Sequence, residues 1–179
     1  MPDDDRRRNT DAQVQELVSR GQHAFRAKQY DAAYGFFERA ASIHPGCAEA
    51  HAWLAAVYGR RIEAALSMSE QIKLLSKLEE KIETALSIDS SLPLARRMNG
   101  AKLLKTPELL GGDPAEAAKE LLYCIEQGMD DCEVWLLLAE SYIKIGEPEK
   151  ARDALKEAVR REPENGKAAE FMQQLQAES

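Results

Sequence analysis

The chain has no long run of apolar residues. A membrane-spanning helix needs about 20 consecutive apolar residues, and a secretory signal peptide needs a shorter apolar stretch near its start. Neither pattern occurs among the 179 residues. The sequence therefore predicts no membrane association and a cytoplasmic location.

Cysteine and histidine are scarce, with three residues of each. Cys47, Cys124 and Cys132 show no C-x2-C spacing, and the histidines do not share a helical face at metal-ligand spacing. A bridge between Cys124 and Cys132 is conceivable, but the missing export signal argues against it. Nor can a nucleophile, a base and an orienting group be assembled. We therefore expect no enzyme activity, no metal and no cofactor.

Basic charge is not concentrated in any part of the chain. The formal net charge is −7, and the one basic run, Arg6 to Arg8, directly follows three aspartates that offset it. Proteins that bind nucleic acids usually carry a clustered excess of Lys and Arg. The charge distribution therefore predicts no nucleic-acid partner.

Residues that favour β-strands are few, whereas good helix formers are abundant. Aromatic residues make up 6% of the chain, and Ala, Leu, Glu, Lys, Arg and Gln are frequent. This composition predicts an all-α protein without a sheet.

A spacing pattern of small and large apolar residues occurs four times. The slots of its last copy hold Trp135, Leu138, Ala139, Tyr142, Ala151, Leu155, Ala158 and Pro163. The same slots near the start of the chain hold Leu17, Arg20, Gly21, Ala24, Ala33, Phe37, Ala40 and Pro45. Two middle copies are longer, with insertions of 11 and 5 residues between their two helices. Small residues let helix backbones approach closely, and the larger ones fill the space between them.

This pattern resembles the tetratricopeptide repeat family, whose 34-residue helix-turn-helix unit carries W-x2-L-G-x2-Y, then A-x3-F, then Pro. The resemblance covers residues 14–165 and implies an all-α, right-handed α-solenoid. Its four repeats are expected at residues 14–47, 48–92, 93–131 and 132–165. We expect a single domain over residues 13–179, preceded by a disordered tail at residues 1–12. A capping helix at 166–177 should pack through Ala169, Met172 and Leu175.

The insertion at residues 60–70 predicts longer helices in the second repeat. Ser67 and Glu70 form a capping box, and an apolar stripe continues through Ile72 and Ile82 without a Pro or Gly. Both helices of this repeat should therefore gain about one to two turns, at roughly 5.4 Å per turn.

The insertion at residues 106–114 contains two glycines before a helix. Asp113 is placed to cap that helix, and Pro114 suits its first position. A phosphate-binding loop would also need a Gly-Lys-Ser/Thr sequence, which is missing. The two insertions should form a lip at one edge of the scaffold, either for binding a partner or for stability. This lip includes Leu109 and Leu110.

The resemblance implies a binding site on the concave surface, which the first helix of every repeat lines. Carried over slot by slot, this groove consists of Gln22, Arg26, Trp53, Ala56, Arg60, Arg97, Met98, Ala101, Lys105, Leu136, Leu137, Glu140 and Lys144. Trp53 has two interpretations, an interface hot spot and extra packing between first helices. The carboxylate clamp of tetratricopeptide cochaperones is missing, because matching positions hold residues such as Val18 and Met98.

Four cations occupy one equivalent slot of the four repeats. Arg26, Arg60, Lys105 and Lys144 are separated by the repeat lengths themselves, 34, 45 and 39 residues. Such a row could steer an acidic peptide into the groove. Alternatively, each cation stabilises the last turn of its own helix through the helix dipole.

The sequence thus predicts a non-catalytic scaffold that binds a peptide or a protein surface through the concave groove or the insertion lip. The alternative is a structural subunit that associates with copies of itself. Both readings follow from the family resemblance, because a repeat scaffold carries many functions.

Overall fold

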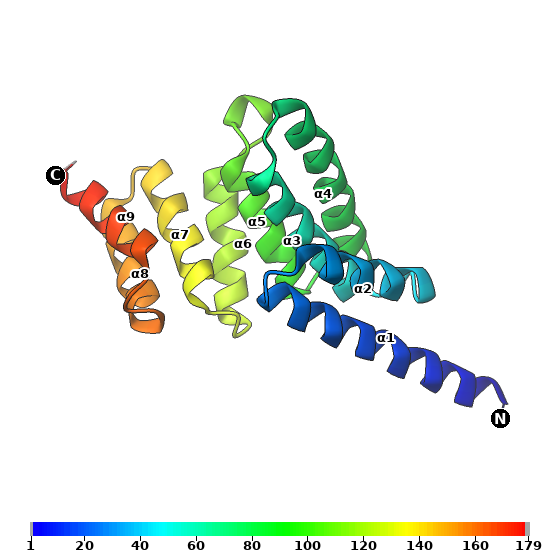
Figure 1. The fold of residues 1–179 in the computed structure, drawn as a ribbon. Coiled ribbons are helices and arrows are strands. Elements are labelled where there is room, and N and C mark those ends of the chain that lie inside the picture. Colours follow the sequence, from blue (N-terminus) through cyan, green and yellow to red (C-terminus); the bar gives the residue numbers. More distant parts are fainter. Residues whose placement is uncertain (1, 178–179) are drawn as a thin grey trace. The chain divides into compact units, whose positions relative to one another are not determined.

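The computed structural model describes the backbone of residues 2–177 and the side chains of residues 8–173. These residues form α-helices and one short 3-10 helix, and no strand occurs among them, which confirms the all-α prediction (Figure 1). The helices are α1 (Pro2–Arg26), α2 (Tyr30–Ile43), α3 (Ala48–Ala64), α4 (Met68–Ile88), α5 (Pro93–Lys105), η1 (Glu108–Leu110), α6 (Pro114–Glu126), α7 (Cys132–Lys144), α8 (Pro148–Arg161) and α9 (Gly166–Ala177).

The helices divide between two compact units, an N-terminal unit of residues 1–95 and a C-terminal unit of residues 96–179. In the N-terminal unit, α1 packs on α2, α2 on α3, and α3 on α4. In the C-terminal unit, α6 packs on α7, α7 on α8, and α8 on α9. Sequential helix pairs therefore build each unit, as expected for helix-turn-helix repeats. A single domain over residues 13–179 stays a prediction.

Side-chain caps fix where several helices begin. The Ser67 hydroxyl accepts a hydrogen bond of 3.2 Å from the Glu70 amide at the start of α4. Asp113 accepts bonds of 3.0 and 2.9 Å from the first free amides of α6. Both caps were predicted, and each satisfies donors that have no partner inside the helix.

The second helix pair is longer than the last one. The helices α3 and α4 have 17 and 21 residues, whereas α7 and α8 have 13 and 14. At 3.6 residues per turn, the differences correspond to about one and two turns. The structure confirms the predicted lengthening, and the Ser67 cap marks the start of the longer α4.

Both chain ends differ from the sequence expectations. The first helix begins at Pro2, where a disordered tail to residue 12 was expected. A helix that is nucleated by packing extends at little cost, since each added residue makes one more backbone bond. At the other end, α9 packs on the core through Ala168, Phe171 and Met172. The predicted contact of Ala169 is wrong, since this residue is exposed, and the side chain of Leu175 lies outside the described residues.

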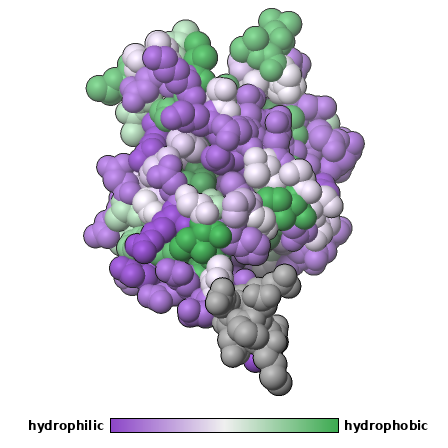
Figure 2. Space-filling view, turned by 90° about the vertical axis from the view of Figure 1, so that its right-hand side faces the viewer, coloured by the Kyte–Doolittle hydropathy of each residue, from purple (hydrophilic) through white to green (hydrophobic). Residues whose placement is uncertain are grey.

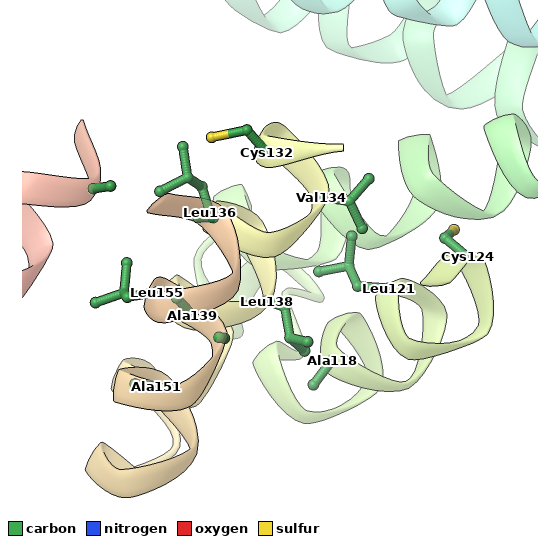
Figure 3. Close-up of a cluster of buried hydrophobic side chains, with 13 residues drawn as sticks. Ala118, Leu121, Cys124, Cys132, Val134, Leu136, Leu138, Ala139, Ala151 and Leu155 are labelled. Carbon is green, nitrogen blue, oxygen red and sulfur yellow. The ribbon is translucent and has the colours of Figure 1, made fainter. Parts of the chain in front are cut away.

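The two units have different cores. The N-terminal core surrounds Phe37 and includes Leu54 and Val57, with Phe25 and Trp53 packed against it. The C-terminal core is built from small and aliphatic side chains of α6, α7 and α8. In Figure 3, Leu121 and Leu138 project into the space between α6 and α7. Alanines at 118, 139, 151, 154 and 158 allow these helices to approach closely.

Candidate functional site

The predicted groove residues of the N-terminal unit lie on α1 and α3. Gln22 donates a hydrogen bond of 2.8 Å to Glu49, and Arg26 is exposed in the last turn of α1. Ala56 is buried, so a partner has little access to it. These contacts link α1 to α3 and leave Arg26 as an accessible cation.

Trp53 packs among aromatic rings of its own unit. Its ring stacks on Phe37 with centroids 5.5 Å apart and an interplanar angle of 8°. Its edge contact with Phe25 has a centroid distance of 5.3 Å. The contacts support the packing interpretation of Trp53, because both neighbours belong to the N-terminal core. Its role as a binding hot spot stays a prediction.

The predicted groove residues of the C-terminal unit lie on α5 and α7. Met98, Ala101, Leu137 and Glu140 are half-buried, and Leu136 is buried. Lys105 pairs with Glu140 across these two helices. Lys144 donates a hydrogen bond of 2.7 Å to the Leu104 carbonyl.

Arg97 also joins this set of contacts. It pairs with Glu133 at 2.6 Å and with Asp131 at 3.4 Å. Its side chain is 18% exposed, so this cation is held near the start of α7 rather than extended into solvent. In the C-terminal unit, the predicted groove cations therefore tie α5 to α7.

One part of the helix-dipole interpretation is wrong. Arg60 was expected in the last turn of its helix, but α3 continues to Ala64, and Arg61 occupies the last turn instead. Arg60 pairs with Glu63 at 3.1 Å. By contrast, Arg26, Lys105 and Lys144 do lie in last turns. Two of the four cations lie in each unit. Their alignment in one row therefore stays a prediction.

Large apolar side chains are exposed on the inserted part of the N-terminal unit. Leu66 is fully exposed, Met68 is 76% exposed and Ile72 is 61% exposed. We call these three residues the α3–α4 tip. The predicted apolar stripe of α4 is buried at Leu78 and Ile82, but Ile72 lies in the additional turns of α4 and is not covered.

The inserted loop of the C-terminal unit also exposes apolar side chains. Leu109 is fully exposed and Leu110 is 77% exposed, both in η1. Figure 2 shows hydrophobic residues as separate groups on a mostly hydrophilic face. Whether the two insertions form one lip stays a prediction, because they belong to different units.

Each unit has a cleft on the side of its second helices. One cleft of about 390 Å³ lies over α3, between α2 and α4. Inside it, Tyr58 donates to Tyr34 at 3.4 Å, and Tyr34 donates to Glu38 at 2.6 Å. The hydrogen bond to Glu38 raises the pKa of Tyr34 strongly, so this hydroxyl stays protonated. Arg61 covers the Tyr34 ring at 4.4 Å, so the cations of the chain itself already occupy this aromatic surface.

The second cleft, of about 500 Å³, lies over α7 between α6 and α8. Leu122, Trp135 and Leu138 line its apolar part, and charged residues of α8 form its rim. Arg161 stacks over the Trp135 ring at 5.1 Å. In this cleft too a cation of the chain covers the aromatic ring, and Leu138 is buried, so Leu122, at 39% exposed, is the main open apolar side chain among those that line it.

The described residues contain no group of three or more His, Cys, Asp or Glu side chains that could hold a metal ion. Cys47, Cys124 and Cys132 are free thiols. Within the same part of the chain, every helix is too short or too polar to cross a bilayer.

Comparisons with known proteins agree with the repeat pattern. A family model for the tetratricopeptide repeat matches residues 109–175. A sequence search of curated proteins finds no match. Several solved structures share the fold, including PilF from Pseudomonas aeruginosa, with a TM-score of 0.69 and 20% identity over 95% of this chain and 70% of PilF.

Two further structures extend this comparison. TTC0263, a tetratricopeptide repeat protein of Thermus thermophilus, has a TM-score of 0.50 and 18% identity over 92% of this chain and 97% of its own. A segment of MamA from Desulfovibrio magneticus has a TM-score of 0.57 and 15% identity, over 92% of this chain and 94% of its own. At these identities, the likeness shows a shared fold. Residues 109–175 thus match the tetratricopeptide repeat model, and the chain shares its fold over most of its length with solved structures that include a tetratricopeptide repeat protein.

Proposed function

We propose that the protein is a non-catalytic module that binds another protein through the α3–α4 tip. Tetratricopeptide repeats generally mediate interactions between proteins, on a scaffold whose insertions are free to vary. The observation that carries the proposal is the exposure of Leu66, Met68 and Ile72 at the end of a helix pair longer than α7 and α8. Exposed apolar groups rimmed by polar residues are typical of protein-binding surfaces.

The concave groove is the second candidate surface, for an acidic peptide. Arg26 is exposed and could attract a negative charge. However, Lys105 and Lys144 already make contacts between α5 and α7, and Trp53 is packed against Phe25 and Phe37. A partner would have to displace these contacts, which favours the tip as the main binding surface.

The tip and the groove respond differently to substitution. The partner is first isolated by co-purification with the native protein, and its affinity is then measured by titration calorimetry. Burial of each large apolar side chain contributes about 1.5–3 kcal/mol. The double variant Met68→Ser and Ile72→Ser should therefore raise the Kd by about 100-fold or more, without a change in stability because both residues are exposed.

The matched control is the double variant Arg60→Glu and Lys105→Glu, which reverses two groove charges. If the tip binds the partner, this variant should bind almost as tightly as the native protein. A large loss of affinity in the charge variant, enhanced at low salt, would instead identify the groove. If both variants bind normally, neither surface is the site and the proposal is wrong.

A further inference from the structure

The helix α4 has three sides, and two of them already make contacts within the N-terminal unit. Leu78 and Ile82 are buried on the core side. Lys77 and Lys81 line the cleft over α3, and Lys73 lies one turn before Lys77 on that same side. Every cation of α4 therefore belongs to the cleft side, and the third side carries none.

Two exposed apolar residues and two carboxylates share the third side. Met68, Ile72, Glu79 and Glu83 are separated by 4, 7 and 4 positions, spacings that return to one face of a helix. Met68 and Ile72 are largely exposed, Glu83 is exposed and Glu79 is half-buried. We call these four residues the α4 row. At 1.5 Å per residue, the row is about 22 Å long.

The two carboxylates of the row are not neutralised by the chain. Neither Glu79 nor Glu83 forms an ion pair or a side-chain hydrogen bond with another described residue. By contrast, the neighbouring Glu80 pairs with Lys81 at 2.8 Å on the cleft side. The row thus combines an apolar half at the tip with an acidic half that is open to a cation from outside.

We propose that the α4 row binds an amphipathic basic helix of a partner protein. Its apolar side chains would cover Met68 and Ile72, and its Lys or Arg side chains would pair with Glu79 and Glu83. A second helix matches the row because both helices repeat their side chains at the same spacing. The inference rests on the proposed function, since the α3–α4 tip supplies the apolar half of the row.

The two halves of the row contribute differently to binding. Burial of Met68 and Ile72 supplies most of the affinity. Exposed ion pairs add little free energy each, but an acidic partner would meet Glu79 and Glu83 with like charge and be rejected. The carboxylates therefore determine which apolar helices are accepted.

Two synthetic peptides test the sign of this selection. Each is an amphipathic helix of about 16 residues, long enough to span the row, with the same Leu face and with either Lys or Glu on its polar face. In fluorescence anisotropy titrations, the native chain should bind the Lys peptide at least about tenfold more tightly than the Glu peptide. Equal affinities, a preference for the Glu peptide or no binding of either peptide would overturn the proposal.

A matched pair of variants separates the row from the overall negative charge of the chain, which is −7. Glu79→Gln with Glu83→Gln should weaken binding of the Lys peptide about tenfold and reduce its salt dependence. The control, Glu164→Gln with Glu170→Gln, removes the same charge at two exposed positions of the C-terminal unit and should bind normally. Equal losses in both variants would mean that the peptide follows net charge and that the proposal is wrong.

The tip variant, Met68→Ser with Ile72→Ser, distinguishes this inference from the proposed function. It should lose both the Lys peptide and the co-purified partner. If the tip variant loses the co-purified partner while Glu79→Gln with Glu83→Gln retains it fully, the tip binds a partner of another chemistry. The proposed function then stands and the present inference is wrong. If the tip variant retains the co-purified partner and the peptide, both are wrong.

Discussion

The two units satisfy the same repeat slot with different chemistry. In the N-terminal unit the large slot of the second helix holds Phe37, whose ring stacks on Trp53. In the C-terminal unit the same slot of the last repeat holds Leu155, buried among alanines of α7 and α8. The slot therefore determines the size and direction of the side chain, while the neighbours decide whether the packing is aromatic or aliphatic.

The polar contacts between helices differ as well. In the C-terminal unit, the carboxylate of Glu120 accepts hydrogen bonds from Arg96 at 3.1 Å and from Asn99 at 2.9 Å. In the N-terminal unit, Arg61 pairs with Asp31 at 2.8 Å and stacks on the Tyr34 ring. One unit thus contains a buried carboxylate that accepts two bonds, and the other contains aromatic surface covered by a cation.

The largest expected effect is at the two versions of the large slot. Phe37→Ala should lower the free energy of unfolding by about 3–5 kcal/mol, and Leu155→Ala by about 2–5 kcal/mol. Phe37→Leu makes the two units alike and should cost less than Phe37→Ala, while losing about 0.5–1.5 kcal/mol of aromatic pairing with Trp53. Chemical denaturation monitored by circular dichroism measures all three. If Phe37→Ala is as stable as the native protein, the packing of Phe37 on Trp53 does not stabilise the N-terminal unit.

The next effect concerns the buried carboxylate. Glu120→Ala leaves Arg96 and Asn99 without this acceptor. It should lower the free energy of unfolding by about 1–3 kcal/mol. The control is Glu133→Ala, which removes the 2.6 Å partner of Arg97. Glu133 is 45% exposed, so this loss should stay below about 1 kcal/mol. Thermal unfolding measures both variants. If Glu120→Ala and Glu133→Ala lose the same stability, burial does not make the contacts of Glu120 stronger than that of Glu133.

A smaller effect is expected where the units differ in a turn. Lys28 has a φ of 59°, and Gly146 has a φ of 75° at the same position of the last repeat. A left-handed conformation costs a non-glycine residue about 1–2 kcal/mol. Lys28→Gly should therefore raise stability by about 0.5–1 kcal/mol, after the entropy of glycine in the unfolded chain is subtracted. Gly146→Ala should lower the stability. Denaturant titrations in which Lys28→Gly is destabilised or Gly146→Ala is stabilised would contradict this prediction.

The smallest effect concerns the thiols and leaves the fold intact. Burial raises the pKa of Cys124 from 9.0 to about 11, whereas Cys47 is half-exposed. Near pH 8, alkylation followed by mass spectrometry should modify Cys47 well before Cys124. Because the folded state favours the neutral thiol of Cys124, its contribution to stability is complete below pH 9 and is lost as the pH rises towards 11. Equally fast modification of both thiols near pH 8 would contradict this assignment.

Features that depend on local spacing could be predicted from the sequence. The caps at Ser67 and Asp113 and the lengthening of α3 and α4 all follow from residues within a few positions of each other. The exposure of Ile72 could not be predicted in this way, because it depends on where the neighbouring helices end. The same holds for Ala168, which packs on the core in place of Ala169.

The candidate sites were less accessible to sequence analysis. Family slots selected Trp53 and Lys105 because first helices usually line the groove, but their contacts depend on Phe37 and Glu140, which lie far away in the sequence. Leu66 and Met68 have no slot in the repeat pattern, since they lie in an insertion. The one available signal was the presence of large apolar residues on both sides of the Ser67 cap.

The stacking of Trp53 on Phe37 has a spectroscopic consequence. The chain has two tryptophans, Trp53 in the N-terminal unit and Trp135 in the C-terminal unit. Trp53 emits from an aromatic stack, whereas Trp135 emits beneath the guanidinium of Arg161. A Trp53→Phe protein therefore reports on the C-terminal unit alone, and a Trp135→Phe protein on the N-terminal unit alone. Coincident fluorescence transitions in the two proteins would mean that the repeats melt as one cooperative body, and separate transitions would give each unit its own melting temperature.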